Sequence, residues 1–245
     1  MIEHDTICAL STAPGTGAIA VVRLSGPLSV PCVRALAPAL PAAPPPRTAL
    51  LAGLHDEEGT IDEALVTCFP APHSYTGEDV VEIATHGSPY IQQRVLHALT
   101  RHGARMARPG EFTLRAFLNR KPDLSQAEAV ADLIASSSRA AHRLAVQQLR
   151  GGYSHRIEHL RQQLIDLGAL IELELDFSEE DVRFAARPEL IALLDGITGI
   201  CDHLIASFRY GNALKEGVPV AIIGAPNSGR STLLNALLQE ARAIV

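Results

Sequence analysis

The chain has 245 residues and a mass of 26.1 kDa, enough for one or two buried cores. No apolar run is long enough to cross a bilayer and the N-terminus lacks a signal-peptide pattern, so we expect a soluble cytoplasmic protein. The net charge of −6 argues against a general affinity for nucleic acid. Four scattered cysteines favour reduced, mostly buried thiols over zinc or disulfides: Cys8, Cys32, Cys68 and Cys201.

From Asp5 to about Asn119 the pattern is mixed α+β. Runs rich in β-branched residues, bounded by Gly and Pro, predict strands over residues 6–10, 19–24, 64–69 and 80–85. A helix is predicted from Ser88 or Pro89 to His102, followed by Gly103.

Two charged residues lie within the predicted strands of this region. Glu82 shares a strand face with Val80 and Ala84, and a buried carboxylate without a partner is costly. It is either an edge-strand residue facing water or an acceptor for a ligand with a fork of N–H donors. Arg23 occupies a similar position at the end of another strand.

The segment from Arg94 to Lys121 is strongly basic, because its seven basic residues are accompanied by one acid, Glu111. A solvated face is the commoner explanation of such a run. The functional alternative is a binding site for an anionic ligand, such as one that carries a carboxylate, or for an RNA phosphate.

From Ser125 onward the pattern predicts long helices. Ser125 and Glu128 have the spacing of a capping box, and the apolar period then continues to Leu149, before Gly151 and Gly152. Two more amphipathic helices are predicted over residues 157–171 and from Pro188 to Phe208. Three apolar stripes must cover one another or be covered by a further helix.

Near its end the chain carries a phosphate-binding loop. Residues 224–231 fit the pattern G-x-x-x-x-G-K-[ST], except that Arg230 stands where the pattern has Lys. The apolar residues 218–223 predict a buried parallel strand before the loop, and residues 231–238 predict a helix after it. GTP hydrolysis also needs a metal-binding acid, a water-positioning group and base-reading loops, which do not fit between Thr232 and Val245. We therefore expect no GTPase activity from these 245 residues alone.

Several motifs follow one another along the chain: residues 5–7, Pro14-Gly15, Arg23–Gly26, Thr76–Asp79 with Glu82, His86-Gly87, Ala107–Asn119 and Asp123–Ile134. Taken together and in this order, they resemble the tRNA modification GTPase family MnmE, also called TrmE. The resemblance implies an α+β tetrahydrofolate-binding, dimerising domain over residues 1–119. It further implies an incomplete all-α helical domain over 120–215 and the first strand, P-loop and helix of an inserted α/β GTPase domain over 216–245.

The resemblance also implies site residues. The family's folate site matches Arg23, Glu82 and Lys121, where Glu82 would accept from the amide and amino edge of a pterin. Lys121 is one of only two lysines, which agrees with a need for a compact ammonium. The GTP phosphates would meet Asn227, Ser228, Gly229, Arg230, Ser231 and Thr232. Ser231 would ligate Mg²⁺ and Asn227 would help to hold K⁺, whereas the guanidinium of Arg230 departs from the family's lysine.

For complete members, the resemblance implies a homodimer through the N-terminal domain that works with the FAD protein MnmG (GidA). Together they place a carboxymethylaminomethyl-type group on the wobble uridine of tRNA. The one-carbon unit comes from 5-formyl- or methylene-tetrahydrofolate, and GTP hydrolysis drives conformational change. The alternative is a non-catalytic folate-binding or dimerisation module related to folate-dependent aminomethyltransferases.

Overall fold

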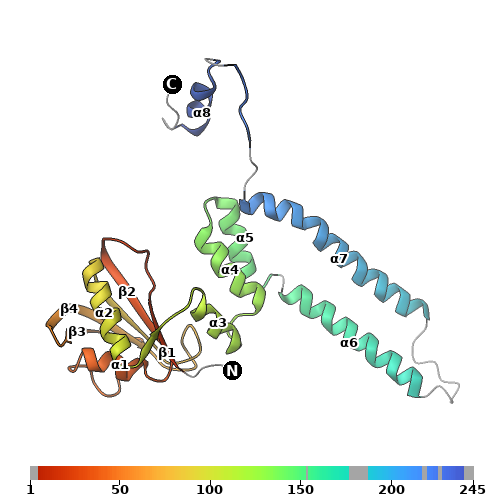
Figure 1. Cartoon of the computed structure of the whole chain (residues 1–245). Helices are drawn as coiled ribbons and strands as arrows, with labels where there is room; N and C mark the ends of the chain where they lie inside the picture. Colours follow the sequence, from red (N-terminus) through yellow and green to blue (C-terminus); the bar gives the residue numbers. More distant parts are fainter. Residues whose placement is uncertain (1–4, 153, 177–186, 217–219, 226–227, 240–245) are drawn as a thin grey trace. The chain divides into compact units, whose positions relative to one another are not determined.

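The computed structural model describes residues 5–152, 154–176, 187–216, 220–225 and 228–239 (Figure 1). The chain divides into two compact units, residues 1–128 and 129–245. Within the described ranges, no helix combines the length and the apolar character needed to span a membrane.

The first unit is built on a six-stranded sheet with the order β3-β4-β5-β2-β1-β6. The strands are β1 (Thr6–Leu10), β2 (Gly17–Ser25), β3 (Ala49–Asp56), β4 (Gly59–Phe69), β5 (Val80–Gly87) and β6 (Ala104–Met106). β1 and β6 are parallel, and the other neighbouring pairs are antiparallel. The four predicted strands are confirmed as β1, β2, β4 and β5, whereas the sequence patterns did not predict β3 and β6.

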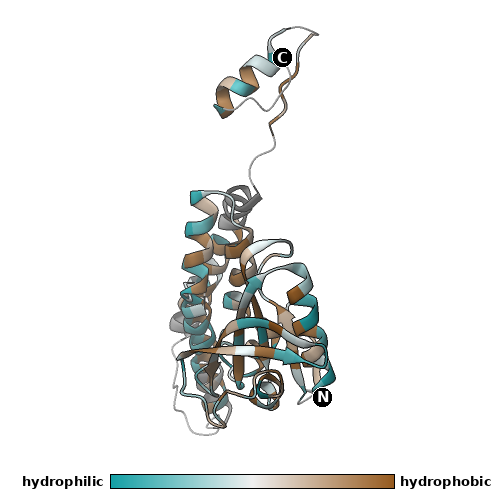
Figure 2. Cartoon of the chain, turned by 90° about the vertical axis from the view of Figure 1, so that its left-hand side faces the viewer, coloured by the Kyte–Doolittle hydropathy of each residue, from teal (hydrophilic) through white to brown (hydrophobic). Residues whose placement is uncertain are grey.

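Two helices, α1 (Ser29–Leu36) and α2 (Pro89–Arg101), pack against this sheet (Figure 1). Helix α2 was predicted and α1 was not. Hydrophobic and hydrophilic residues alternate along the strands (Figure 2). The cross-strand partners Val22 and Ile83 are fully buried in the core shared with Val33 and Leu99 of the helices. Because side chains alternate between the faces of a strand, the next pair along, Arg23 and Glu82, lies on the opposite face.

The cysteines are free thiols. Cys8, Cys32 and Cys68 are buried in the first unit, and Cys201 is exposed in the second. The predicted burial is therefore confirmed for three of the four cysteines.

The second unit is helical, and helix α4 spans the boundary between the units. The helices are α4 (Leu124–Ala135), α5 (Arg139–Leu149), α6 (Ser154–Asp176), α7 (Arg187–Glu216) and α8 (Arg230–Leu238). The two predicted amphipathic helices are confirmed as α6 and α7. The apolar stripe of α6 is incompletely covered within the described residues, since Leu164 is 50% exposed.

Two details of the predicted helix from Ser125 to Leu149 are wrong. The helix begins earlier, because the capping box is formed by Asp123 and Gln126: each side chain accepts the other's backbone N–H at 2.9 Å. The helix is also interrupted before Arg139. There the Oγ of Ser138 accepts the N–H of Ala141 at 3.1 Å and caps a new helix, α5.

The predicted strand over residues 218–223 is not confirmed. Residues 218 and 219 lie outside the described ranges, and Val220 to Gly224 are not in a strand. Val220 is 82% exposed and Ile223 is 91% exposed. A strand is stabilised by hydrogen-bonded neighbours, and the described residues of the second unit contain only helices as regular elements.

Candidate functional site

The centre of the candidate site is an ion pair between two neighbouring strands. Arg23 on β2 lies directly opposite Glu82 on β5. The Nη2 and Nε atoms of Arg23 lie 2.7 and 2.9 Å from the same oxygen, Oε1 of Glu82. Among the described residues, none donates a hydrogen bond to the second oxygen, Oε2. The side chains of Arg23 and Glu82 keep 25% and 30% exposure, so the pair remains accessible from solvent.

This geometry removes one of the two interpretations of Glu82. β5 lies between β4 and β2 in the sheet, so Glu82 is not on an edge strand. It is a partly exposed carboxylate in the middle of a sheet with one oxygen available. That arrangement favours the interpretation as a ligand acceptor.

Two aromatic rings lie against the guanidinium of Arg23. Its central carbon is 5.1 Å from the ring centre of Tyr75 and 5.8 Å from that of Phe112, both within cation–π distance. Tyr75 belongs to the loop before β5, and Phe112 belongs to helix α3 (Glu111–Leu118). The Tyr75 hydroxyl and the Thr113 Oγ1 are 2.9 Å apart, which ties the loop to the helix.

Lys121 reaches the same loop. Its backbone N–H donates to the carbonyl of Ala116 at 2.9 Å, so it continues directly from α3. Gly77 has a φ of +83°, and a Cβ added there would be 3.6 Å from Cε of Lys121 and 3.1 Å from Cβ of Asn119. The structure thus pairs Arg23 with Glu82 and brings Lys121 to the loop that carries Tyr75.

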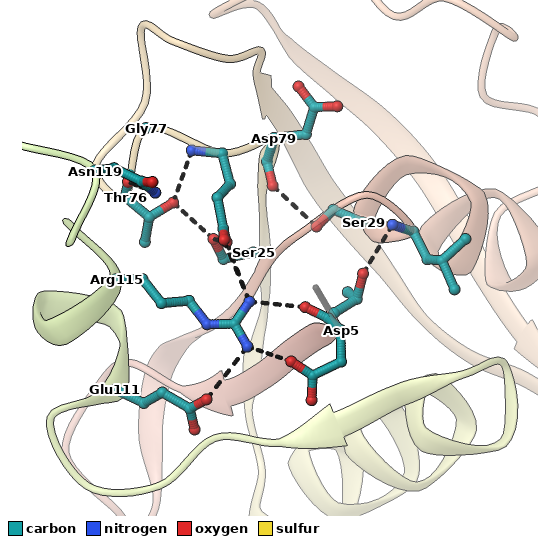
Figure 3. A network of polar contacts seen from close by, with 12 residues as sticks. Asp5, Ser25, Ser29, Thr76, Gly77, Asp79, Glu111, Arg115 and Asn119 are labelled. Carbon is teal, nitrogen blue, oxygen red and sulfur yellow. Dashed lines mark hydrogen bonds and ion pairs between the residues drawn. The ribbon is translucent and has the colours of Figure 1, made fainter. Parts of the chain in front are cut away.

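A buried arginine that the sequence analysis did not single out holds this region together (Figure 3). Arg115 of α3 is only 5% exposed. Its guanidinium donates to the backbone carbonyl and carboxylate of Asp5 at 2.7 and 2.5 Å and to carboxylate oxygens of Glu78 and Glu111 at 3.2 Å each. Three distant parts of the sequence therefore meet at one side chain.

Glu78 continues the network into the sheet and the loop. Its Oε2 accepts the hydroxyl of Ser25 at 2.7 Å, and Ser25 lies 2.6 Å from the hydroxyl of Thr76. The side-chain amide of Asn119 donates to the carbonyl of Thr76 at 2.7 Å. The backbone of the loop beside Lys121 is thus fixed from both sides.

The same network shifts the pKa of two carboxyls. Hydrogen bonds from Arg105, together with the backbone N–H of Arg108 and the side chain of Arg115, lower the pKa of Glu111 to about 2. Arg105 and Arg115 also lower the pKa of Asp5 below its usual value, against the opposing effect of burial. Both carboxyls are therefore ionised at neutral pH, as their ion pairs require.

The basic segment from Arg94 to Lys121 is mostly neutralised by acids from other parts of the first unit. Arg94 pairs with Asp56, and Arg101 pairs with Glu57 at 2.8 Å. Arg105 and Arg115 pair with the acids of the network. Four of the seven basic side chains are thus committed to internal ion pairs. An anion site is therefore not supported at these four side chains, and it stays a prediction for Arg108, Arg120 and Lys121.

A cavity of about 710 Å³ lies elsewhere in the first unit, beside α1. None of the three predicted folate residues lines it. Its walls are mainly proline and alanine side chains, with Arg34 and Asp79 as the charged ones. Because polar groups that orient a ligand converge at the Arg23–Glu82 pair and not here, we place the candidate site at the pair.

The second candidate region is the phosphate-binding loop. Gly229 has a φ of +77° and precedes the first residue of α8, Arg230, so Arg230, Ser231 and Thr232 form the first turn of a helix. The N–H groups of such a turn are suited to an anion. A Cβ at Gly224 would lie 2.6 Å from the Oγ of Ser228, so Gly224 and Ser228 approach each other closely. Asn227 lies outside the described residues, which contain no cluster of metal-ligating side chains.

The fold and the two regions define a class: an α+β unit with a solvent-accessible ion pair on its sheet, followed by helices and a loop with the sequence pattern of nucleotide-binding proteins. Residues 6–121 match the family model described as "GTP-binding protein TrmE N-terminus", and residues 124–236 match "MnmE helical domain". The two models together cover nearly the whole chain. The chain belongs to the MnmE (TrmE) family.

Curated relatives agree with this assignment. Proteins named tRNA modification GTPase MnmE from Porphyromonas gingivalis and Bacteroides thetaiotaomicron are 56% and 55% identical over 249 residues, and these matches cover 99% and 100% of this chain. A relative of the same name from Christiangramia forsetii is 54% identical over 246 residues. The matches cover 52%, 53% and 52% of the P. gingivalis, B. thetaiotaomicron and C. forsetii proteins, so the chain spans about half their length.

Proposed function

We propose that the first unit binds a reduced folate, 5-formyl- or methylene-tetrahydrofolate, through Glu82, Arg23 and Lys121. The observation that carries this proposal is the Arg23–Glu82 pair, accessible from solvent and flanked by two aromatic rings. The edge of a pterin presents adjacent N–H donors, which a carboxylate can accept in pairs. The ammonium of Lys121, beside Gly77, is suited to the carbonyl, formyl or glutamate oxygens of the same ligand.

We further propose that the chain is the N-terminal part of a tRNA uridine-5-carboxymethylaminomethyl modification GTPase. This rests on the family and on the printed names of its relatives. In the whole protein the folate would supply a one-carbon unit for the wobble uridine of tRNA. The partner would be the FAD-dependent MnmG (GidA), and the N-terminal units, with the boundary at about residue 119, would form the homodimer.

The nucleotide site is proposed for the whole protein only. Residues 216–245 would open its GTPase domain, where residues 218–223 would gain neighbouring strands. Ser231, in the first turn of α8, has the hydroxyl needed for Mg²⁺, and Asn227 would contribute to a K⁺ site. Arg230 would place a planar guanidinium where a lysine ammonium is usual, which makes nucleotide affinity the property to test.

The competing proposal is a folate-binding or dimerisation module without catalysis. It is favoured by one observation: the α+β unit holds the candidate folate residues, whereas the described residues before the phosphate loop, Val220 to Gly224, are not in a strand. The two proposals share the folate site. GTP hydrolysis distinguishes them. Only the modification-GTPase proposal predicts hydrolysis when the chain is extended by the remainder of a family GTPase domain.

The folate proposal is tested by calorimetry with 5-formyltetrahydrofolate on the 245-residue chain and its Glu82→Gln variant. The amide replaces one acceptor oxygen with a donor, so we expect a loss of about 1.5–3 kcal/mol, or roughly 10- to 150-fold in affinity. Glu63→Gln is the matched control, since Glu63 is exposed on the adjacent strand β4. Equal affinity of the Glu82→Gln variant and the unaltered chain would refute the assignment.

A further inference from the structure

The guanidinium of Arg23 contacts only one oxygen, Oε1, of the Glu82 carboxylate. Its Nε donates to Oε1 of Glu82 at 2.9 Å, and its Nη2 lies 2.7 Å from the same oxygen, so the guanidinium occupies the approach to Oε1. A ligand that donates two parallel hydrogen bonds needs one lone pair on each carboxylate oxygen. Such a ligand must displace Arg23 from Oε1 while it also occupies Oε2.

The side chain that must move resembles the ligand that would replace it. A guanidinium is a flat group with a fork of N–H donors, and so is the amino-pyrimidinone edge of a pterin. The rings of Tyr75 and Phe112, at 5.1 and 5.8 Å, lie against this flat group. Aromatic rings at such distances stack on a planar heterocycle as well as on a guanidinium.

The two rings are held in place independently of Arg23. The hydroxyl of Tyr75 is bonded to Thr113, and the loop is further fixed because the Oγ of Ser74 accepts the N–H of Gly77 at 3.0 Å. Phe112 follows Glu111, whose carboxylate is anchored by Arg105 at 2.7 Å. The rings therefore keep their positions when Arg23 leaves, and they need not reorganise around a ligand.

We propose that Tyr75 and Phe112 form an aromatic clamp for the flat ring of the ligand, and that Arg23 fills this clamp until the ligand arrives. The inference rests on the proposed folate function, which it deepens by naming two binding residues and a displacement step. Entry of the ring turns Arg23 from an internal partner of Glu82 into a group free to meet an oxygen of the ligand. The clamp also selects for planar heterocycles with a donor fork and against ligands that carry only carboxylates.

The test uses the 245-residue chain, 5-formyltetrahydrofolate and calorimetry. Phe112→Leu and Tyr75→Leu remove the rings and keep apolar bulk, so each is expected to weaken binding about 5- to 30-fold, the range of stacking and cation–π contacts. Tyr75→Phe keeps the ring but loses its bond to Thr113, so it is expected to bind more weakly than the unaltered chain and more tightly than Tyr75→Leu. Tyr90→Leu is the control. Tyr90 also lies against an arginine, Arg94 at 5.7 Å, but Arg94 pairs with Asp56 and not with Glu82, so this variant should leave binding unchanged.

The displacement step has its own readout. The Nε–H signal of Arg23 in a ¹⁵N-arginine spectrum, identified by its loss in Arg23→Met, is expected to shift when the site is saturated. If the unaltered chain binds the folate but both leucine variants bind equally well, the clamp is wrong and the folate proposal stands. An unmoved Arg23 signal at saturation overturns the displacement. If the unaltered chain does not bind at all, the folate proposal fails and the clamp fails with it.

Discussion

Arg115 offers the sharpest test of what holds the candidate site together. It is 5% exposed and bonded to Asp5, Glu78 and Glu111, so Arg115→Met keeps much of the side-chain volume and removes the charge. Removing one partner of a fully buried ion pair costs about 3–5 kcal/mol, because the remaining charge is left unpaired.

The contacts that Asp5, Glu78 and Glu111 keep in Arg115→Met determine how much stability the variant should lose within that range. After the change, Arg105 still pairs with Asp5 and Glu111, and Ser25 still donates to Glu78. The three carboxylates are also 11–31% exposed, which allows water to reach them. We therefore expect a loss at the lower end, about 3 kcal/mol in the free energy of unfolding. With a urea dependence of about 2 kcal/mol per molar, the midpoint falls by about 1.5 M.

The cysteines provide an assay for the first unit alone. Cys8, Cys32 and Cys68 are buried there, and burial raises the pKa of the Cys8 thiol to about 11. In a Cys201→Ser background, a thiol reagent added along a urea series reports only the unfolding of this unit. The control is Arg161→Met, whose partner Glu158 lies 3.1 Å away on an exposed helix face, and it should change the midpoint little. A loss below about 1 kcal/mol for Arg115→Met would refute the reasoning.

Two further predictions concern the same unit. Since Glu111 has a folded-state pKa of about 2, below its usual value of 4.5, its stabilising effect is complete above about pH 4.5 and is lost as the pH falls toward 2. Glu111→Gln should therefore flatten the fall of stability in that range, measured by pulses of pepsin along a urea series, and an unchanged slope would contradict this. Gly26 and Gly59 both have positive φ, +129° and +111°, but only at Gly26 would a Cβ clash with backbone, 2.7 Å from the carbonyl of Asp5. Gly26→Ala should cost at least about 2 kcal/mol more than Gly59→Ala in the thiol assay, and equal costs would show that strain, not the clash, dominates.

Strong local patterns allowed much of the fold to be predicted. β5 was predictable because its β-branched residues follow a Gly-containing loop, and α2 because Pro89 and Gly103 bound an amphipathic stretch. β3 was missed because residues 49–56 do not alternate cleanly and contain Gly53. β6 has three residues, and its pairing with β1 is a long-range contact that no local pattern records.

The candidate site could also be predicted in part: single residues could be found from the sequence, but not the contacts between them. Glu82 stood out because a carboxylate within an apolar strand is unusual, and the family resemblance added Arg23 and Lys121. The pairing of Arg23 with Glu82 depends on the register between β2 and β5, which sequence alone did not give. Arg115 was counted only as one charge in a basic run, because its partners Asp5 and Glu78 are 110 and 37 residues away.

The pairing of β1 with β6 has a consequence for how the protein is made. Thr6 lies beside Ala104, and Asp5 is bonded to Arg105 and Arg115, so the first strand needs residues from the end of the unit to complete its contacts. At ordinary rates of translation, the interval between the synthesis of these two parts is on the order of ten seconds. During that time one edge of β1 has no neighbouring strand, and an unpaired edge is where nascent chains pair wrongly. The order of synthesis therefore leaves this edge of β1 open to wrong pairing until the end of the unit has been made.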